Sequence, residues 1–439
     1  MKGFLIAGTN SGIGKTTISM ALMSAFENVS PFKVGPDYID PKFHEVVTGN
    51  KSYNLDLFMM GEDFVKYSFY KHHKDFSIIE GVMGLYDGID NSLENNSSAH
   101  VARVLDIPVI LIVDGIGKST SIAAQILGYR MLDKRVNLKG VIINKVSGEK
   151  TYNIFKEAIE KYTDVKCLGY VKKNEKLDIS SRHLGLLQAD EVIDLKEKID
   201  ILKNEVLENI DLEEIEKIAK FSIDSSYINN FKIEDKFLTL KNKFKNKKIG
   251  RAKDLAFSFY YNDNIKLLKK LGFEIIDFSP IKDKKIPECD ILYFGGGYPE
   301  NFLQELSSNK DMISSIKKHY KDNKFIFAEC GGFMYLSKSI ENKEGEVFKM
   351  CDIVPCSTVM TNRLNISRFG YIYIKDTDGN VIGRGHEFHY SKIKEVFEDT
   401  RIMKAFKKDG RNWETIFKNK NCFAGYPHVH LFGLNLDKI

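Results

Sequence analysis

The chain has 439 residues, 43% of them hydrophobic, which is enough for two or three domains that each bury a full core. Its 65 basic and 60 acidic residues leave a net charge of +5, too small an excess to imply a nucleic-acid partner. Six cysteines in so long a chain do not form a disulfide framework, so we expect reduced thiols and a cytoplasmic protein. No apolar run reaches the ~18 residues that a membrane span requires.

Short apolar runs alternate with longer amphipathic segments in the first half of the chain. The runs predict buried strands over Gly3–Ala7, Ser77–Ile79, Val109–Val113 and Val141–Ile143. The segments between them, including Thr16–Phe26 and Ser119–Leu132, have helical spacing. This alternation favours an α/β fold in which a doubly wound parallel sheet forms the N-terminal domain.

Composition changes between about Glu205 and Lys248, where a charged helical segment is followed by the basic run LKNKFKNKK. We interpret this run as a solvated linker rather than as a binding patch. Apolar runs then resume, with strands predicted over Lys248–Ala252, Ala256–Phe259, Ile291–Tyr293 and Phe325–Ala328 and a helix over Asn264–Leu271. The predicted organisation is an ATP-binding domain at residues 1–204, a linker at 205–245 and a second α/β domain at 246–439.

A strand, a glycine-rich turn and a helix follow one another in the N-terminal segment FLIAGTNSGIGKTTISMAL. The N–H groups of such a turn, together with the positive end of the helix dipole, bind phosphate oxygens. Lys15 is expected to reach the β- and γ-phosphates of ATP, and Thr16 to offer its hydroxyl to Mg²⁺. The strict motif has glycine six residues before the lysine, whereas this chain has Thr9 there and Gly8 one position earlier, as in the dethiobiotin synthetase-like branch of P-loop proteins.

Asn144 closes the predicted strand GVIIN, where its amide could read adenine; a plain strand-end asparagine is the alternative. The predicted nucleotide-binding residues are therefore Gly8, Gly12, Gly14, Lys15, Thr16, Thr17 and Asn144.

Two acidic strings accompany the loop, FKVGPDYIDPKFH with Asp37 and Asp40, and SIIEGVMGLYDG with Glu80 and Asp87. Ligands of a parallel sheet gather at the carboxyl ends of its strands, which would bring Glu80 beside the phosphate loop. There it would hold Mg²⁺, directly or through water, together with Thr16 and Asp37. The alternative for each aspartate of GPDYIDP is a turn or a helix cap.

Cys330, in the string FIFAECGGFMYL, is the candidate nucleophile. A predicted strand precedes it and a helical run follows, so the cysteine would occupy a sharp turn whose small neighbours expose its sulfur above the sheet. The N–H of Gly331 and the loop around Gly296 would then stabilise an oxyanion, and His428 in the closing segment YPHVHLF would be the base. A buried structural cysteine is the alternative, and the scattered cysteine and histidine pairs fit a zinc site poorly.

Eight strings resemble, in matching order over essentially the whole chain, the cobyrinate and cobyrate amidotransferase family: KVGPDYIDPKFH, EGVMGLYDG, RHLGLL, KDLAFSFYYNDN, YFGGGYPE, FAECGGFMYL, GRGHEFHYS and YPHVHLF. The resemblance implies a dethiobiotin synthetase-like P-loop domain followed by a class I glutamine amidotransferase domain. The implied reaction uses ATP, Mg²⁺ and glutamine to amidate the a and c carboxylates of cobyrinic acid or a close corrinoid, through an acyl phosphate and ammonia released by a thiol.

Cys330 matches the family nucleophile and His428 its base. The side that faces the acid substrate would be lined by Asp37, Tyr38, Asp40 and Asp87. We expect Asp40 or Asp87 to position a nucleophile or ammonia rather than the metal.

The chain departs from the resemblance at two places. Most class I amidotransferases carry glutamate two residues after the histidine, whereas this chain has His430 there, as this family's tail would have it. Ser180 and Ser181 stand before RHLGLL in place of a proline and an acid, while His183 matches and its role stays open.

Two other functions are alternatives to this one. The same fold could amidate another tetrapyrrole, such as hydrogenobyrinic acid or nickel-sirohydrochlorin. A switch ATPase like ParA or MinD is disfavoured, because those proteins have a second lysine where this chain has Asn10. The expected partners are glutamine and a corrinoid or related tetrapyrrole carboxylate, without nucleic acid or membrane, and a homodimer is left open.

Overall fold

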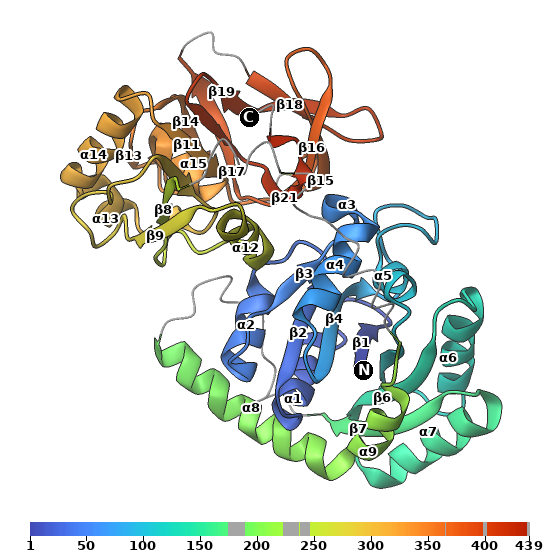
Figure 1. Cartoon of the computed structure of the whole chain (residues 1–439). Helices are drawn as coiled ribbons and strands as arrows, with labels where there is room; N and C mark the ends of the chain where they lie inside the picture. Colours follow the sequence, from blue (N-terminus) through green and yellow to red (C-terminus); the bar gives the residue numbers. More distant parts are fainter. Residues whose placement is uncertain (174–188, 223–236, 238–245, 365, 398–401, 437–439) are drawn as a thin grey trace. The chain divides into compact units, whose positions relative to one another are not determined.

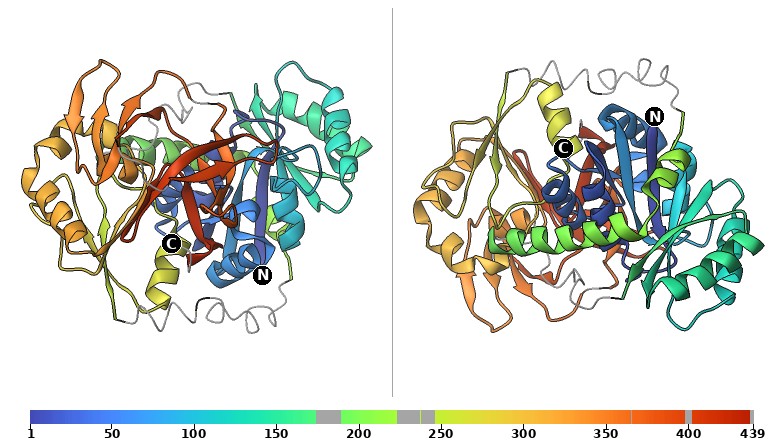
Figure 2. Two further views of the ribbon diagram at one scale, coloured as in Figure 1. Left: turned by 90° about the horizontal axis from the view of Figure 1, so that it is seen from above. Right: turned by 90° about the horizontal axis from the view of Figure 1, so that it is seen from below.

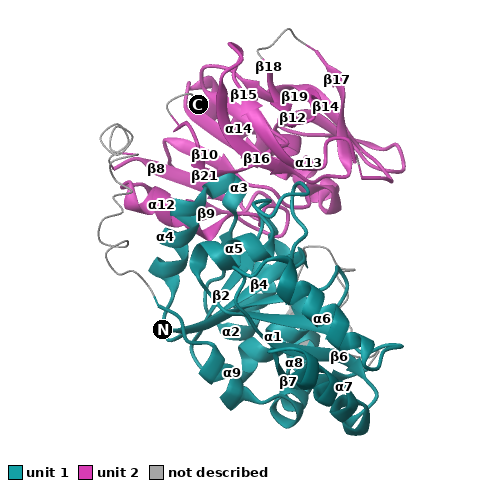
Figure 3. Cartoon of the chain, turned by 90° about the vertical axis from the view of Figure 1, so that its right-hand side faces the viewer, with its two compact units in different colours: residues 1–231 teal, residues 232–439 magenta. Residues whose placement is uncertain are grey.

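The computed structural model describes residues 1–173, 189–222, 237, 246–364, 366–397 and 402–436. The chain divides into two compact units, Met1–Phe231 and Lys232–Ile439, which are coloured separately in Figure 3. The features predicted at Ser180, Ser181 and His183, and most of the basic run before Lys248, lie outside the described residues.

The first unit is built on a seven-stranded parallel sheet with the strand order β3-β2-β4-β1-β5-β6-β7 (Figure 1). Its strands are β1 (Lys2–Gly8), β2 (Val29–Val34), β3 (Tyr53–Leu55), β4 (Phe76–Gly84), β5 (Val109–Asp114), β6 (Leu138–Val146) and β7 (Lys166–Lys172). Strand β1 lies centrally, between β4 and β5, and its residues from Gly3 to Gly8 are all buried. The loop that follows β1 therefore emerges at the middle of the sheet's carboxyl edge, where ligands of such sheets bind.

Helices cover both faces of this sheet. They are α1 (Lys15–Ala25), α2 (Ile39–Thr48), α3 (Leu57–Met60), α4 (Glu62–His72), α5 (Ser98–Leu105), α6 (Ser121–Leu132), α7 (Glu149–Tyr162), α8 (Ala189–Asn209) and α9 (Leu212–Ile218). Helix α1 packs against both α2 and α8, and the right-hand view of Figure 2 shows α8 running along this face.

The predicted linker at 205–245 includes the end of α8 and all of α9, which belong to the first unit. Helix α8 buries a stripe of apolar side chains at helical spacing, formed by Leu195, Ile199, Leu202 and Val206. Ile215 of α9 is fully buried in the same core. The outer faces of these helices are rich in charged residues, so the overall composition of the segment did not indicate the buried stripe.

The second unit has a ten-stranded mixed sheet in the order β21-β16-β15-β18-β19-β20-β11-β10-β8-β9 and a four-stranded sheet in the order β13-β12-β14-β17. The parallel part contains β8 (Lys248–Ala252), β9 (Glu274–Phe278), β10 (Ile291–Phe294), β11 (Phe325–Glu329) and β20 (Cys422–Gly425). The antiparallel part contains β15 (Gly370–Lys375), β16 (Val381–Glu387), β18 (Ile402–Phe406), β19 (Asn412–Lys418) and β21 (His428–Leu434). The smaller sheet contains β12 (Ser337–Glu341), β13 (Val347–Lys349), β14 (Val354–Met360) and β17 (Ser391–Val396).

The helical elements of the second unit are α12 (Asn262–Lys270), the short 3₁₀ helix η2 (Pro299–Asn301), α13 (Leu303–Ser308), α14 (Lys310–Lys321) and α15 (Gly331–Leu336). One predicted element is wrong. The segment Ala256–Phe259 is not a strand, because Asp254 Oδ1 accepts hydrogen bonds from the N–H groups of Ala256 and Phe257 and bends the chain there. Phe259 forms an isolated β-bridge with Gly296. The helical run predicted after Cys330 is present as α15 and ends at Leu336, since the next residues pair as β12 with β13 and β14.

All six cysteines are free and buried. None of the described helices combines the length and the apolar character that a membrane crossing requires.

Candidate functional site

The loop between β1 and α1 is held from several sides by its neighbours. Gly14 ends it with φ +97°, a conformation that glycine adopts at no steric cost, and a Cβ there would meet Asn144 Nδ2 at 2.4 Å. Asn144 Nδ2 donates to the carbonyl of Ile13 at 2.8 Å, and the hydroxyl of Tyr129 donates to the carbonyl of Thr9 at 2.7 Å. The loop's shape is therefore fixed by the protein itself before any ligand binds. Asn144 is engaged in this support, and its contact with adenine stays a prediction.

Lys15 begins α1 and turns back over the loop, where its Nζ donates to the carbonyl of Asn10 at 3.3 Å. Burial, together with the nearby Lys33, lowers the pKa of Lys15 to about 8. A lysine with that pKa carries its charge at neutral pH while lying in a partly dry site, where its field on an anion is strong.

A buried ionic cluster lies beside Lys15, centred on Glu80. Glu80 Oε1 accepts from Thr16 Oγ1 at 2.6 Å and from Lys33 Nζ at 3.0 Å, and its Oε2 lies 2.7 Å from His44 Nε2. Lys33 and Glu80 are opposite one another in the register of β2 and β4, which explains why the pair forms. Lys33 Nζ also contacts Asp40 Oδ2 at 2.5 Å.

The charges of this cluster hold one another in place. Burial alone would raise the pKa of Glu80, but Lys33 and His44 lower it far below its ordinary value. Burial alone would lower the pKa of Lys33. The negative charges of Asp40 and Glu80 have the larger combined effect and raise this pKa above its ordinary value. The pKa of Asp40 is raised by burial and by the charge of Glu80. Glu80 is thus an ionised carboxylate next to the hydroxyl of Thr16.

The remaining predicted residues of the acidic strings have structural partners. Asp37 caps α2, because its two carboxylate oxygens accept from the N–H groups of Ile39 and Asp40 at 3.0 and 3.2 Å. This is the helix cap that the sequence left open for Asp37. Asp87 Oδ2 accepts from the N–H of Gly84 at 3.0 Å and closes the turn after β4.

Cys330 occupies a strained turn between β11 and α15, with φ +47° and ψ −105°. Strain of this kind persists only where the surroundings fix the backbone, and it is common at active sites. Here the Cys330 N–H donates to the carbonyl of Gly425 at 2.7 Å, and the Gly332 N–H donates to that of Gly295 at 3.1 Å. The arrangement of strand, strained cysteine and helix is the one that a nucleophile elbow requires.

The glycine loop after β10 touches both the elbow and the histidine. A Cβ on Gly331 would lie 3.1 Å from the backbone nitrogen of Gly297, and one on Gly296 would lie 2.3 Å from Cε1 of His428. Only glycine allows so close an approach at Gly296. Consecutive residues of one loop thus adjoin the turn that carries Cys330 and the imidazole of His428.

Burial favours the neutral forms of both members of the predicted pair, Cys330 and His428. Burial raises the pKa of the Cys330 thiol above its ordinary value, and the carboxylates of Glu300 and Glu387 raise it further. A hydrogen bond from the Gly331 N–H acts in the opposite direction. Burial also lowers the pKa of His428 well below its ordinary value. An unprotonated imidazole can accept a proton from a thiol, which is the role predicted for His428 toward Cys330.

Comparison with known proteins identifies both halves of the chain. Residues 4–187 match the model of the CobQ/CobB/MinD/ParA nucleotide binding domain, and residues 248–436 match that of the CobB/CobQ-like glutamine amidotransferase domain. The cobyrinate a,c-diamide synthase of Fusobacterium nucleatum is 68% identical over 435 residues, which cover 99% of this chain and 98% of that protein. The chain belongs to the cobyrinate a,c-diamide synthase family.

More distant members of the cobyrinate a,c-diamide synthase family also align along the whole chain. Those of Caldanaerobacter subterraneus and Listeria innocua are 42% and 40% identical and each cover 98% of this chain, with 95% and 97% of their own length aligned. The predicted family, the predicted fold of a P-loop α/β domain followed by a glutamine amidotransferase domain, and the predicted enzyme class, a glutamine-dependent ligase, are confirmed.

The family string GRGHEFHYS contains a buried cluster to which the sequence assigned no role. Glu387 accepts from Thr415 Oγ1 at 2.7 Å, from Trp413 Nε1 at 3.2 Å and lies 3.2 Å from His389 Nε2. His386 is the cross-strand partner of His428, and their rings stack with centroids 5.0 Å apart. His386 of β16 therefore lies against the imidazole of His428.

Two members of the string KVGPDYIDPKFH were also missed as site residues, namely Lys33 and His44. A signal for Lys33 exists, because it is a charged residue inside the otherwise uncharged strand segment VSPFKV. No local signal marks His44, whose partner Glu80 is 36 residues away.

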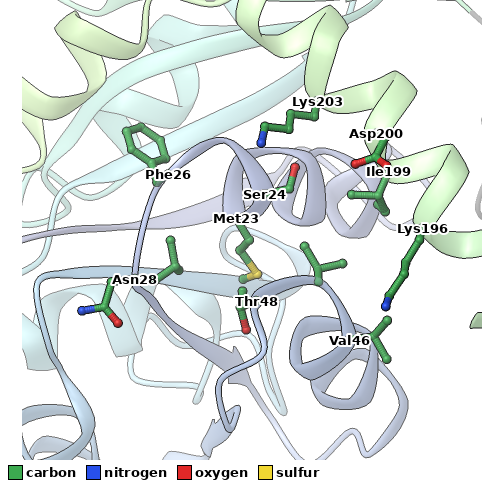
Figure 4. A pocket seen from close by; sticks show the side chains of 12 residues that line it. Met23, Ser24, Phe26, Asn28, Val46, Thr48, Lys196, Ile199, Asp200 and Lys203 are labelled. Carbon is green, nitrogen blue, oxygen red and sulfur yellow. The ribbon is translucent and has the colours of Figure 1, made fainter.

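A pocket of about 360 Å³ lies elsewhere on the first unit, between the carboxyl ends of α1 and α2 and one face of α8 (Figure 4). Its side chains come from Met23, Ser24, Phe26, Asn28, Val29, Val46, Val47, Thr48, Lys196, Ile199, Asp200 and Lys203. Its first lining residue on α1, Met23, lies eight residues after Lys15, roughly 12 Å along the helix axis. The pocket is therefore separate from the phosphate loop.

Proposed function

We propose that the chain converts the a and c carboxylates of cobyrinic acid into amides during cobalamin biosynthesis, with glutamine as the nitrogen donor and ATP as the activating reagent. The observation that carries the proposal is the presence in one chain of a phosphate loop with a buried Lys15 and of a strained Cys330 next to a glycine loop. Each half supplies one part of such a reaction, and neither supplies both.

The thiol half would release ammonia. His428 accepts the proton of Cys330 as the sulfur attacks the side-chain amide carbon of glutamine, and the oxyanion that forms is stabilised by the N–H of Gly331 and by the loop around Gly296. The C–N bond then breaks, with His428 returning the proton to the leaving nitrogen. Water hydrolyses the thioester to glutamate and restores the thiol.

The nucleotide half would activate the acid. A substrate carboxylate oxygen attacks the γ-phosphorus of ATP, ADP leaves, and ammonia displaces phosphate from the acyl phosphate to give the amide. Phosphoryl transfer depends chiefly on positioning and charge neutralisation, which Lys15 and Lys33 would supply. We place Asp40 beside the reacting carboxylate, since its contact with Lys33 sets it at the rim of the cluster.

The side chains of Thr16 and Glu80 suit Mg²⁺, which prefers hard oxygen ligands and retains several waters. Mg²⁺ would neutralise charge on the β- and γ-phosphates. Glu80 also accepts from Lys33, which favours contact through water over direct ligation. Asp37 is a weaker candidate because its oxygens cap α2.

The substrate assignment can be tested by product mass. Purified protein would be incubated with ATP, Mg²⁺, glutamine and, separately, cobyrinic acid, hydrogenobyrinic acid or nickel-sirohydrochlorin. We expect cobyrinic acid to lose about one mass unit for each of two amidations, because –NH₂ replaces –OH. Conversion of either other macrocycle with higher kcat/KM would reassign the substrate, and no conversion of any of them would contradict the function.

The pKa of Lys15 predicts how ATP binding depends on pH. Phosphate prefers the ammonium form, so bound ATP raises this pKa and binding takes up a proton above pH 8. We expect the Kd for ATP to be flat below about pH 8 and then to rise up to tenfold per pH unit. Calorimetric titrations between pH 6.5 and 9.5 would measure this. Lys15→Arg is the control, because its guanidinium stays charged throughout; an equal rise in that variant would contradict the assignment.

A further inference from the structure

The carboxylate that immediately precedes the nucleophile is bonded to the strand that carries the histidine. Glu329 is the last residue of β11 and is 2% exposed. Its Oε1 accepts from the N–H of Val429, the residue after His428, at 2.8 Å. Its Oε2 accepts from the hydroxyl of Tyr293 on β10, the strand that leads into the glycine loop, at 2.7 Å. One side chain therefore connects the three segments that form the thiol site.

Strand β21, whose Val429 donates this hydrogen bond, lies at the edge of its sheet and, among the described strands, has a neighbour on one side only. Strand β21 is the last strand of the ten-stranded sheet and pairs with β16 along one side. Along its other side, Asn264 of α12 accepts from the N–H of Leu431 at 2.9 Å and donates to the carbonyl of Val429 at 3.0 Å. Side chains of Glu329 and Asn264 thus bond the backbone groups that a further strand would otherwise bond.

The supporting groups form one connected network. Asn264 also hydrogen-bonds the hydroxyl of Tyr293, which in turn donates to Glu329. Burial raises the pKa of Glu329 to about 7, and the hydrogen bonds from Val429 and Tyr293 oppose that rise. A buried network whose members are all bonded is rigid, and its geometry carries over to the groups attached to it.

We propose that Glu329 is the positioning residue that fixes His428 against Cys330 through the backbone of β21, in a chain that has His430 where an orienting acid would be expected. The proposal rests on the proposed thiol chemistry. Glu329 acts on the strand and not on the imidazole, so it sets the distance between base and nucleophile. Catalysis is sensitive to this distance, since a displacement of about 1 Å can cost roughly 10²-fold in rate.

Three variants test the proposal. Glu329→Ala removes both acceptors, and we expect kcat for glutamine-dependent amidation to fall about 100-fold, with KM for glutamine changed less than about twofold. Glu329→Gln keeps an oxygen for the Val429 N–H and should recover to within about tenfold of the wild type. Tyr293→Phe removes only the hydroxyl and should lose several-fold. Glu414→Gln, at an exposed position of β19, is the matched control and should lose nothing.

The readouts separate positioning from folding. Amidation with added ammonia bypasses the thiol and should be unchanged in all variants, while labelling of Cys330 by a diazoketone analogue of glutamine should slow in the same order as kcat. Losses that instead follow each variant's unfolding temperature, or an unchanged kcat in Glu329→Ala, would overturn the proposal. If Glu329→Ala does not fold, Glu329→Gln and Tyr293→Phe decide between these outcomes. Absence of labelling in the wild type would refute the thiol chemistry itself.

Discussion

Cys330→Ser should lose glutamine-dependent amidation by at least ~10³-fold and keep amidation with added ammonia at the wild-type rate. The serine hydroxyl is a much weaker nucleophile than the thiol, and a base whose pKa burial lowers cannot ionise it readily. Ammonia supplied from solution makes the thioester step unnecessary. Mass spectrometry of the product formed with each nitrogen source measures the ratio of glutamine-dependent to ammonia-dependent amidation.

Cys422→Ser is a suitable control for this experiment. Cys422 lies on β20, next to β11, and is also buried, so the same atom exchange tests the effect of a hydroxyl in this core. It should lower stability while leaving the ratio of the two activities unchanged. If Cys330→Ser loses both activities to the same extent, Cys330 supports the fold and is not the nucleophile.

The parts of the site that lie within one short segment could be predicted from the sequence. The phosphate loop is such a part, because the strand, the turn and Lys15 are adjacent in the chain. The elbow is another, since Cys330 carries its small neighbours with it. In both parts, the residues that form the turn, including the glycines it requires, are consecutive in the sequence.

Contacts between distant segments could not be predicted in this way. Lys33 and Glu80 are 47 residues apart and meet only because β2 and β4 are neighbours in register. Glu329 and Val429 are 100 residues apart, and nothing in the string FAECGG indicates that its glutamate bonds another strand. The antiparallel strands of the second unit were missed for another reason, since charged residues interrupt them, as in β17 and β18, and they lack the long apolar runs of β1 or β5.

Lys15→Ala should abolish amidation with either nitrogen source, by ~10³-fold or more, because the charge that neutralises the transferring phosphoryl group is removed. The loop itself should survive, since Tyr129 and Asn144 hold its backbone independently of the lysine side chain. ADP formation and amide formation should fall together. Lys139→Ala, an exposed lysine of β6 in the same unit, provides the control and should change neither.

The same Lys15→Ala protein should still be labelled at Cys330 by the glutamine analogue, because the elbow, the glycine loop and His428 all belong to the second unit. Lys15→Ala is thus expected to keep the thiol chemistry and lose activation of the acid. Cys330→Ser is expected to lose the thiol chemistry and keep activation of the acid. Amidation by Lys15→Ala with added ammonia would mean that the phosphate loop does not activate the carboxylate. The acyl phosphate route would then be excluded while the thiol site stood.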